Sequence, residues 1–111
     1  METRTFTEQE TALLRQIRET VHAIEPDAHL ILYGSRARGN AEPDSDWDLL
    51  VLLDGDATYD RIDGVRHRLY ELEWETNTIL SSIVRSKDVW DSPLYEAMPF
   101  HTNVVHDGMR L

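Results

Sequence analysis

The sequence contains no cysteine, a single lysine and no long apolar run, and each scarcity removes a class of protein. Without cysteine there is no disulfide framework, no thiolate chemistry and no zinc site built on sulfur ligands. No stretch approaches the roughly 18 apolar residues that a membrane span needs, so no membrane association is expected. The opening METRTFTEQE lacks the basic-then-apolar pattern of a secretory signal, so a cytoplasmic location is the default expectation.

Positive charge is also scarce, because 21 acidic side chains face only 11 basic ones and give a formal net charge of -10. A surface this negative repels a phosphate backbone, so broad nucleic-acid binding is not expected. A nucleotide that arrives with its own magnesium is compatible with this charge. The length fits one domain over residues 1–111, without internal repeats, low-complexity segments or linkers.

Apolar residues at helical spacing predict the helices. Thr7 and Glu10 form a capping-box pattern ahead of the first such stripe, and Pro26 would stop the helix. In the C-terminal part, Gly108 is a plausible stop for the last helix. The predicted helices cover residues 7–25, 57 to about 74, 89–98 and 100–107.

Short apolar runs bounded by turn residues predict the strands. HLILY ends at Gly34, and WDLLVLL is closed by an Asp-Gly-Asp turn. The predicted strands cover residues 29–33, 47–53 and 78–84. The order helix, strand, strand, helix, strand, helix predicts an α/β (α+β) fold class with a small mixed sheet flanked by helices.

The stretch between the first two predicted strands holds the candidate chemistry, and residues 34–53 read GSRARGNAEPDSDWDLLVLL. Successive side chains of a strand point to opposite faces, so Asp46 and Asp48 are expected on one face, with Cα atoms roughly 6.5 to 7 Å apart. Carboxylates at that separation repel each other unless a cation lies between them. The arrangement suits magnesium bound together with substrate phosphates.

The loop before this pair has the residue types of a phosphate cradle. Gly34 directly follows a strand and lets backbone amides approach an anion, and the hydroxyl of Ser35 can donate to a phosphate oxygen. A helical turn from Ser35 through Arg38 would direct its free amides at the same anion. Arg36 and Arg38 add positive charge, and the sequence leaves open which of them faces the site.

Together these residues resemble a known signature, because G-S-x-x-x-G followed by S-D-x-D-L is similar to the pattern of the polymerase-β-like nucleotidyltransferase superfamily. The likeness is greatest to its stand-alone minimal nucleotidyltransferases, the MNT proteins. The resemblance implies the polymerase-β-like fold. It also implies transfer of a nucleoside monophosphate from a nucleoside triphosphate, ATP first, to a hydroxyl, with Mg²⁺ or Mn²⁺. The implied catalytic and metal-binding residues are Asp46 and Asp48, and the implied nucleotide-binding residues are Gly34, Ser35, Arg36, Arg38 and Ser45.

The resemblance also implies a partner. Many small members of the family look like antitoxins of HEPN-type ribonucleases, some of which they silence by adding AMP to a tyrosine. A chain of 111 residues has no second lobe for an acceptor, so the acceptor is expected on another molecule. We therefore predict the antitoxin of a HEPN/MNT toxin-antitoxin pair, with homo-oligomerisation left open by the sequence.

A third acidic residue, which active family members carry on the strand after the second long helix, is harder to find here. The segment reads WETNTILSS, and Asn77 falls nearest the expected position. Glu75 or Glu73 would replace it if the register differs. An amide is a weaker metal ligand and a poor proton acceptor. The alternative function is therefore a catalytically weak or inactive nucleotide-binding module that neutralises a partner toxin by forming a complex.

Other candidate chemistries find little support in the sequence. His101 and His106 lack the spacing of a zinc pair, and Ser81 and Ser82 have no nearby His-Asp arrangement for a serine nucleophile. The three tryptophans are expected to fill the core or line an interface rather than stack on a base. Transfer to a small molecule such as an aminoglycoside would need a substrate-binding lobe or a dimer.

Overall fold

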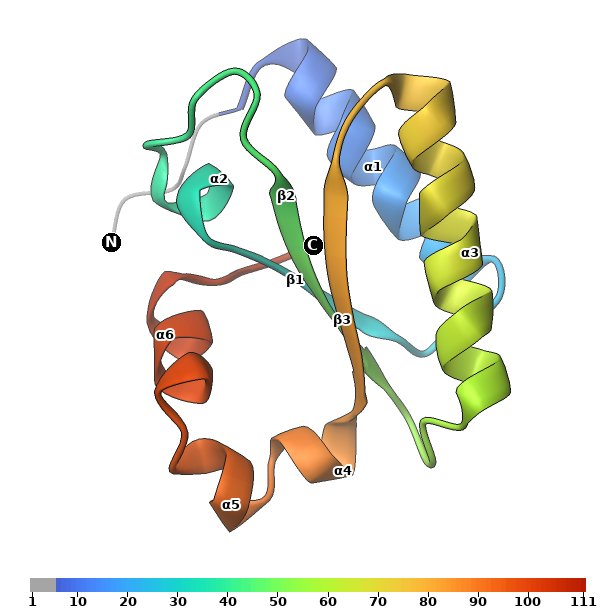
Figure 1. The fold of residues 1–111 in the computed structure, drawn as a ribbon, viewed down its shortest axis with the longest axis vertical. Helices are drawn as coiled ribbons and strands as arrows, with labels where there is room; N and C mark the ends of the chain where they lie inside the picture. The colour runs from blue at the N-terminus through green and yellow to red at the C-terminus, as the bar shows by residue number, and fades with distance from the viewer. Residues whose placement is uncertain (1–5) are drawn as a thin grey trace.

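A four-stranded mixed sheet forms the centre of the computed structural model, which describes residues 6–111 (Figure 1). The arrangement confirms the predicted α+β class with helices flanking a small mixed sheet. The elements, in chain order, are α1 (Glu8–His22), β1 (His29–Tyr33), α2 (Ser35–Arg38), β2 (Trp47–Leu53), α3 (Tyr59–Thr76), β3 (Leu80–Ser86), α4 (Lys87–Trp90), α5 (Pro93–Glu96), α6 (Pro99–Asp107) and β4 (Met109–Arg110).

The strand order is β3-β2-β1-β4, so β1 and β2 occupy the middle of the sheet. β1 pairs antiparallel with β2 and with β4, whereas β2 and β3 run parallel. β2 is buried on both faces from Leu49 to Leu53, which explains its unbroken apolar sequence. Within β2, only the side chain of Asp48 is partly exposed.

Helices cover both faces of the sheet and create two apolar cores. On one face, α1 and α3 pack on the sheet through Ile17, Leu69 and their neighbours. On the other face, α4 and α6 contribute Trp90 and Val104, which pack against Leu50 and partly buried side chains of β1 and β3 (Figure 1). None of the described helices is long and apolar enough to cross a membrane.

The first long helix begins as predicted, and its end differs. The Thr7 hydroxyl accepts from the Glu10 amide at 3.1 Å, and the Glu10 carboxylate accepts from the Thr7 amide at 2.9 Å, so the capping box is present. α1 nevertheless ends at His22 rather than at 25, because the chain leaves the helix through a turn that precedes Pro26.

Several element boundaries later in the chain also differ from the prediction. The predicted helix over 89–98 is wrong, because the serine N-caps Ser86 and Ser92, with Pro93 behind the second, divide this segment into α4 and α5. α3 continues to Thr76, so β3 occupies 80–86 instead of 78–84. The edge strand β4 was not predicted, since a strand of two residues carries no periodic pattern.

Arg61 of α3 joins Glu25, which lies 36 residues earlier in the chain, to the turn just before its own helix. Its guanidinium donates to both carboxylate oxygens of Glu25 at 2.6 and 3.0 Å, and to the backbone oxygens of Asp54 and Asp56. The bond from Arg61 lowers the pKa of Glu25. The pair therefore ties the end of α1 to the turn between β2 and α3.

Replacing Glu25 by glutamine is expected to lower the free energy of unfolding by about 1 to 2 kcal/mol at neutral pH, because one partner of a partly buried, doubly hydrogen-bonded ion pair loses its charge. The lowered pKa means that this stabilisation is present above the unfolded value of 4.5 and is lost as the pH falls through the folded value. Urea unfolding of wild type and Glu25→Gln at neutral and at acidic pH measures the difference in the free energy of unfolding. Glu19→Gln, an exposed change on α1, is the control, and a deficit that persists undiminished in acid would contradict the assignment.

Candidate functional site

The cradle glycine and the second aspartate are neighbours across the sheet. Tyr33, the last residue of β1, pairs with Asp48, so the chain passes the Asp48 carboxylate as it enters Gly34. Gly34 has φ +76°, and a Cβ at this position would collide with Oδ2 of Asp48. Only a residue without a side chain fits here. Glycine therefore brings the loop backbone into direct contact with a carboxylate.

The two aspartates act on each other electrostatically. Burial raises the pKa of Asp48, and the nearby charge of Asp46 raises it further, whereas Arg38 opposes the shift. Asp46 itself is exposed just before β2, and Asp48, two residues further along, is half-buried within the strand. The structure thus brings Asp46, Asp48 and Gly34 together at one end of the central strands.

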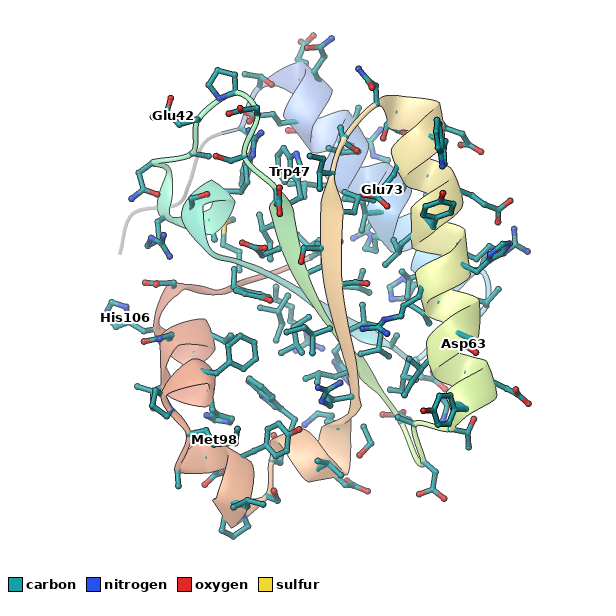
Figure 2. The ribbon with its side chains drawn as sticks, in the orientation of Figure 1. Glu42, Trp47, Asp63, Glu73, Met98 and His106 are labelled. Atoms are coloured by element: carbon teal, nitrogen blue, oxygen red, sulfur yellow. The ribbon has the colours of Figure 1, made fainter. Side chains whose placement is uncertain are left out.

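Ser35 and Ser45 shape the backbone around this point. Ser35 begins the single helical turn of α2, which ends at Gly39 in the left-handed conformation. The Ser45 hydroxyl accepts from the Glu42 amide at 2.9 Å and closes the turn that leads into β2. Glu42 and Trp47, labelled in Figure 2, mark the two ends of this connection.

The structure separates the roles of the two arginines that the sequence left open. Arg36 donates to the backbone oxygens of Ser45 and Pro43, lies over the ring of Trp47 and contacts Glu10. These contacts hold its guanidinium on the loop and on the side of β2 opposite Asp48. The phosphate contact that the sequence predicts for Arg36 stays a prediction.

Arg38 lies on the carboxylate side. Its guanidinium is 3.5 Å from Asp107 of α6, and its charge acts on Asp48. Its side chain is 45% exposed, so it can turn toward an incoming anion. A hydrogen bond with His106, supported by the charge of Arg38, lowers the pKa of Asp107, which keeps this partner ionised. Sequence reasoning missed Asp107, because only the fold brings α6 next to α2.

None of the residues proposed for the third carboxylate lies where it was expected. Asn77 is the C-cap of α3 with φ 53°, and Glu75 is an exposed residue of that helix. Glu73 accepts from the Leu80 amide at 2.9 Å and so holds the start of β3. The strand after the helix presents Ser81 opposite Asp48 instead. The parallel register of β2 and β3 determines which residue lies opposite Asp48, and the sequence did not reveal this register.

Two of the three tryptophans fill the core, as expected, and the third is exposed. Trp47 and Trp90 are buried, and Trp90 stacks on His101 with ring centroids 4.4 Å apart. Trp74 is 76% exposed on α3 and contacts Tyr70 edge to face. The stacking of His101 gives it a packing role.

A glycine-hinged loop against paired carboxylates, at the end of adjacent strands in an α+β sheet, defines a domain of the nucleotide-handling class. The nucleotidyltransferase domain family matches the chain over residues 14–106. The chain belongs to this family, and nucleotidyl transfer is the general activity of its class. A comparison with curated proteins gave no match.

The family implies a nucleoside triphosphate with a divalent cation, and the oxygen donors present here fit one such ion. Magnesium takes one or two protein carboxylates together with substrate phosphates, which is what Asp46 and Asp48 offer. Over residues 6–111, no group of three or more His, Cys, Asp or Glu could hold a metal ion by itself. The remaining ligands would come from substrate phosphates and water.

Proposed function

We propose that the chain is a metal-dependent nucleotidyltransferase that transfers a nucleoside monophosphate, AMP first, to a hydroxyl of a partner protein. We further propose that it acts in the cytoplasm as the antitoxin of a HEPN/MNT pair. The observation that carries the proposal is the contact between the bare Cα of Gly34 and the carboxylate of Asp48, beside Asp46.

Each residue of the site has a distinct task in this proposal. The Gly34 backbone gives the triphosphate room beside Asp48, the Ser35 hydroxyl donates to a phosphate oxygen, and Arg38 offers positive charge to the same group. Asp46 and Asp48 hold the divalent cation. When bound there, a divalent cation would supply Lewis acidity for an attacking hydroxyl and for a departing pyrophosphate.

An acceptor on another protein is supported by the open surroundings of the carboxylates. Asp46 and Ser81 are both exposed, so the entrance to β2 and β3 is accessible from solvent. The acidic surface, with a net charge of -10, favours a basic partner over a nucleic acid. A tyrosine or another hydroxyl on such a partner can reach the site without a second lobe on this chain.

Radiolabelled nucleoside triphosphates test the proposal. The purified chain is incubated with a HEPN-type partner from a neighbouring gene, Mg²⁺ and each α-labelled triphosphate in turn. We expect label on the partner from ATP, with pyrophosphate released and with no label in EDTA. Absence of label from every triphosphate, although the partner complex forms, would contradict catalysis.

A second candidate function is favoured by Ser81, which occupies the place opposite Asp48 where a third carboxylate would lie. A serine hydroxyl is a poor proton acceptor at neutral pH. The chain would then bind a nucleotide and neutralise its partner by complex formation, with little or no turnover. In that case the Asp46→Asn, Asp48→Asn double variant still protects cells from the toxin.

Ser81→Asp is expected to raise metal-dependent transfer by about tenfold or more, because it adds an acidic oxygen donor on the same face as Asp48. Ser82→Asp is the matched control, since the neighbouring side chain projects to the opposite face of β3. Initial rates with labelled ATP and the partner measure the effect. Equal rates in wild type and the Ser81 variant would remove Ser81 as the explanation for weak turnover.

A further inference from the structure

We propose that Arg36 is a positioning residue that fixes the loop bearing Asp46 and does not contact the nucleotide. The inference rests on the proposed nucleotide site and adds to it a residue that sets its metal affinity. It reassigns one of the two cradle arginines from ligand contact to support of a metal-binding carboxylate.

The hydrogen bonds of Arg36 end on the backbone just before Asp46. Nε donates to the Ser45 oxygen at 3.3 Å, and Nη2 donates to the same oxygen at 2.9 Å and to the Pro43 oxygen at 3.2 Å. Two nitrogens of one planar group thus hold a single carbonyl. This oxygen belongs to the peptide unit that continues into Asp46, so its position limits how the Asp46 backbone can move.

The guanidinium also fixes the residue that follows Asp46. Its central carbon lies 4.5 Å from the ring centroid of Trp47, a cation–π contact. Trp47 is buried, and its amide donates to the Ile79 oxygen at 2.9 Å, which locks it against the start of β3. Asp46 is therefore held from both sides, by Ser45 and by Trp47, through one arginine.

The remaining nitrogen of Arg36 faces α1. Nη1 lies 3.6 Å from the carboxylate of Glu10, and the Arg36 side chain is only 12% exposed. Its nitrogens thus all point toward protein groups on the side of β2 away from Asp48. By contrast, Arg38 is 45% exposed and acts on Asp48 electrostatically. The two arginines of one helical turn serve different purposes.

The planar fork of arginine is necessary for this task. Lysine offers a point charge that cannot bind two carbonyl oxygens and stack flat on an indole at the same time. Residues that orient a metal ligand typically change metal affinity by about 10- to 100-fold when they are altered. Arg36→Lys, which keeps the charge, should therefore weaken the metal-dependent part of nucleotide binding.

Calorimetric titration with ATP, once with Mg²⁺ and once with EDTA, separates positioning from direct contact. For Arg36→Lys we expect affinity for ATP with Mg²⁺ to fall about tenfold or more, with affinity in EDTA unchanged. Arg38→Met should weaken binding under both conditions. Arg66→Met, an exposed change on α3, is the matched control and should match wild type. Thermal melts verify that each variant is folded.

The outcomes distinguish this inference from the proposed function. If wild type does not bind ATP with Mg²⁺, the proposed nucleotide site itself fails. If wild type binds and Arg36→Lys binds equally well, or loses affinity equally with and without Mg²⁺, the positioning role is overturned. Hydrogen exchange of the amides of residues 44–46 provides a second measurement, and we expect faster exchange in Arg36→Lys. Unchanged exchange would overturn the inference as well.

Discussion

Replacing Asp48 by asparagine is expected to lower the proposed metal-dependent nucleotidyl transfer by about a thousandfold or more. An amide of the same shape keeps the packing near the start of β2 and removes the charge that would hold the cation. Losing about 4 kcal/mol of charge stabilisation in the transition state corresponds to this factor. Rates of label transfer from ATP to the partner measure the loss.

The same substitution is expected to leave the fold intact or to stabilise it. Burial raises the pKa of Asp48, so its ionised form is less favourable in the folded chain than in the unfolded chain. A raised pKa contributes stability below the unfolded value, and that contribution is lost as the pH rises through the folded value. At neutral pH the neutral amide should therefore raise the melting temperature in EDTA.

Asp44→Asn is the matched control for Asp48→Asn, because Asp44 is an exposed residue of the loop before Asp46. It should keep wild-type transfer and wild-type stability. Loss of activity in Asp48→Asn together with a higher melting temperature would mark Asp48 as a functional group that weakens the fold. Wild-type transfer by Asp48→Asn would contradict its assignment.

Replacing Gly34 by alanine is expected to lower the free energy of unfolding by about 3 kcal/mol and to abolish nucleotide binding. A side chain at φ +76° and ψ -159°, a region essentially limited to glycine, costs about 1 to 3 kcal/mol, and its Cβ would occupy the place of Asp48 Oδ2. Relief requires the carboxylate to move, which spoils the cation site. Urea unfolding and titration with ATP and Mg²⁺ measure the two effects.

Gly55→Ala separates backbone strain from steric collision. Gly55 has φ +72°, and a Cβ there would find its nearest neighbour, Arg61 Nη1, at 3.9 Å. The control should therefore lose about 1 to 2 kcal/mol and keep ATP binding. If Gly34→Ala costs no more than Gly55→Ala and still binds ATP, the close contact between the cradle and Asp48 is wrong.

Local sequence signals were sufficient for the elements that frame the site. The capping box of Thr7 and Glu10 fixed the start of α1, and the apolar run after Trp47 defined the central strand. A glycine directly after β1 indicated the tight loop. These features depend on residues close in the chain, so their physical cause can be recognised without a structure.

Features set by long-range pairing could not be predicted in the same way. The place opposite Asp48 depends on the parallel register of β2 and β3, and a shift of this register exchanges Ser81 for another residue. Arg36 and Arg38 have different contacts because the Arg36 guanidinium packs over the ring of Trp47, and the sequence alone does not show this contact. Asp107 joins the site only because α6 folds back onto α2.

Anomalous scattering from Mn²⁺ in crystals grown with a non-hydrolysable ATP analogue locates the cation and the triphosphate relative to Asp46, Asp48 and Gly34. We expect one manganese peak within bonding distance of both Asp46 and Asp48, with the triphosphate against the Gly34 backbone and the Ser35 hydroxyl. Manganese bound elsewhere on the chain, or a triphosphate that leaves Gly34 uncontacted, would contradict this expectation.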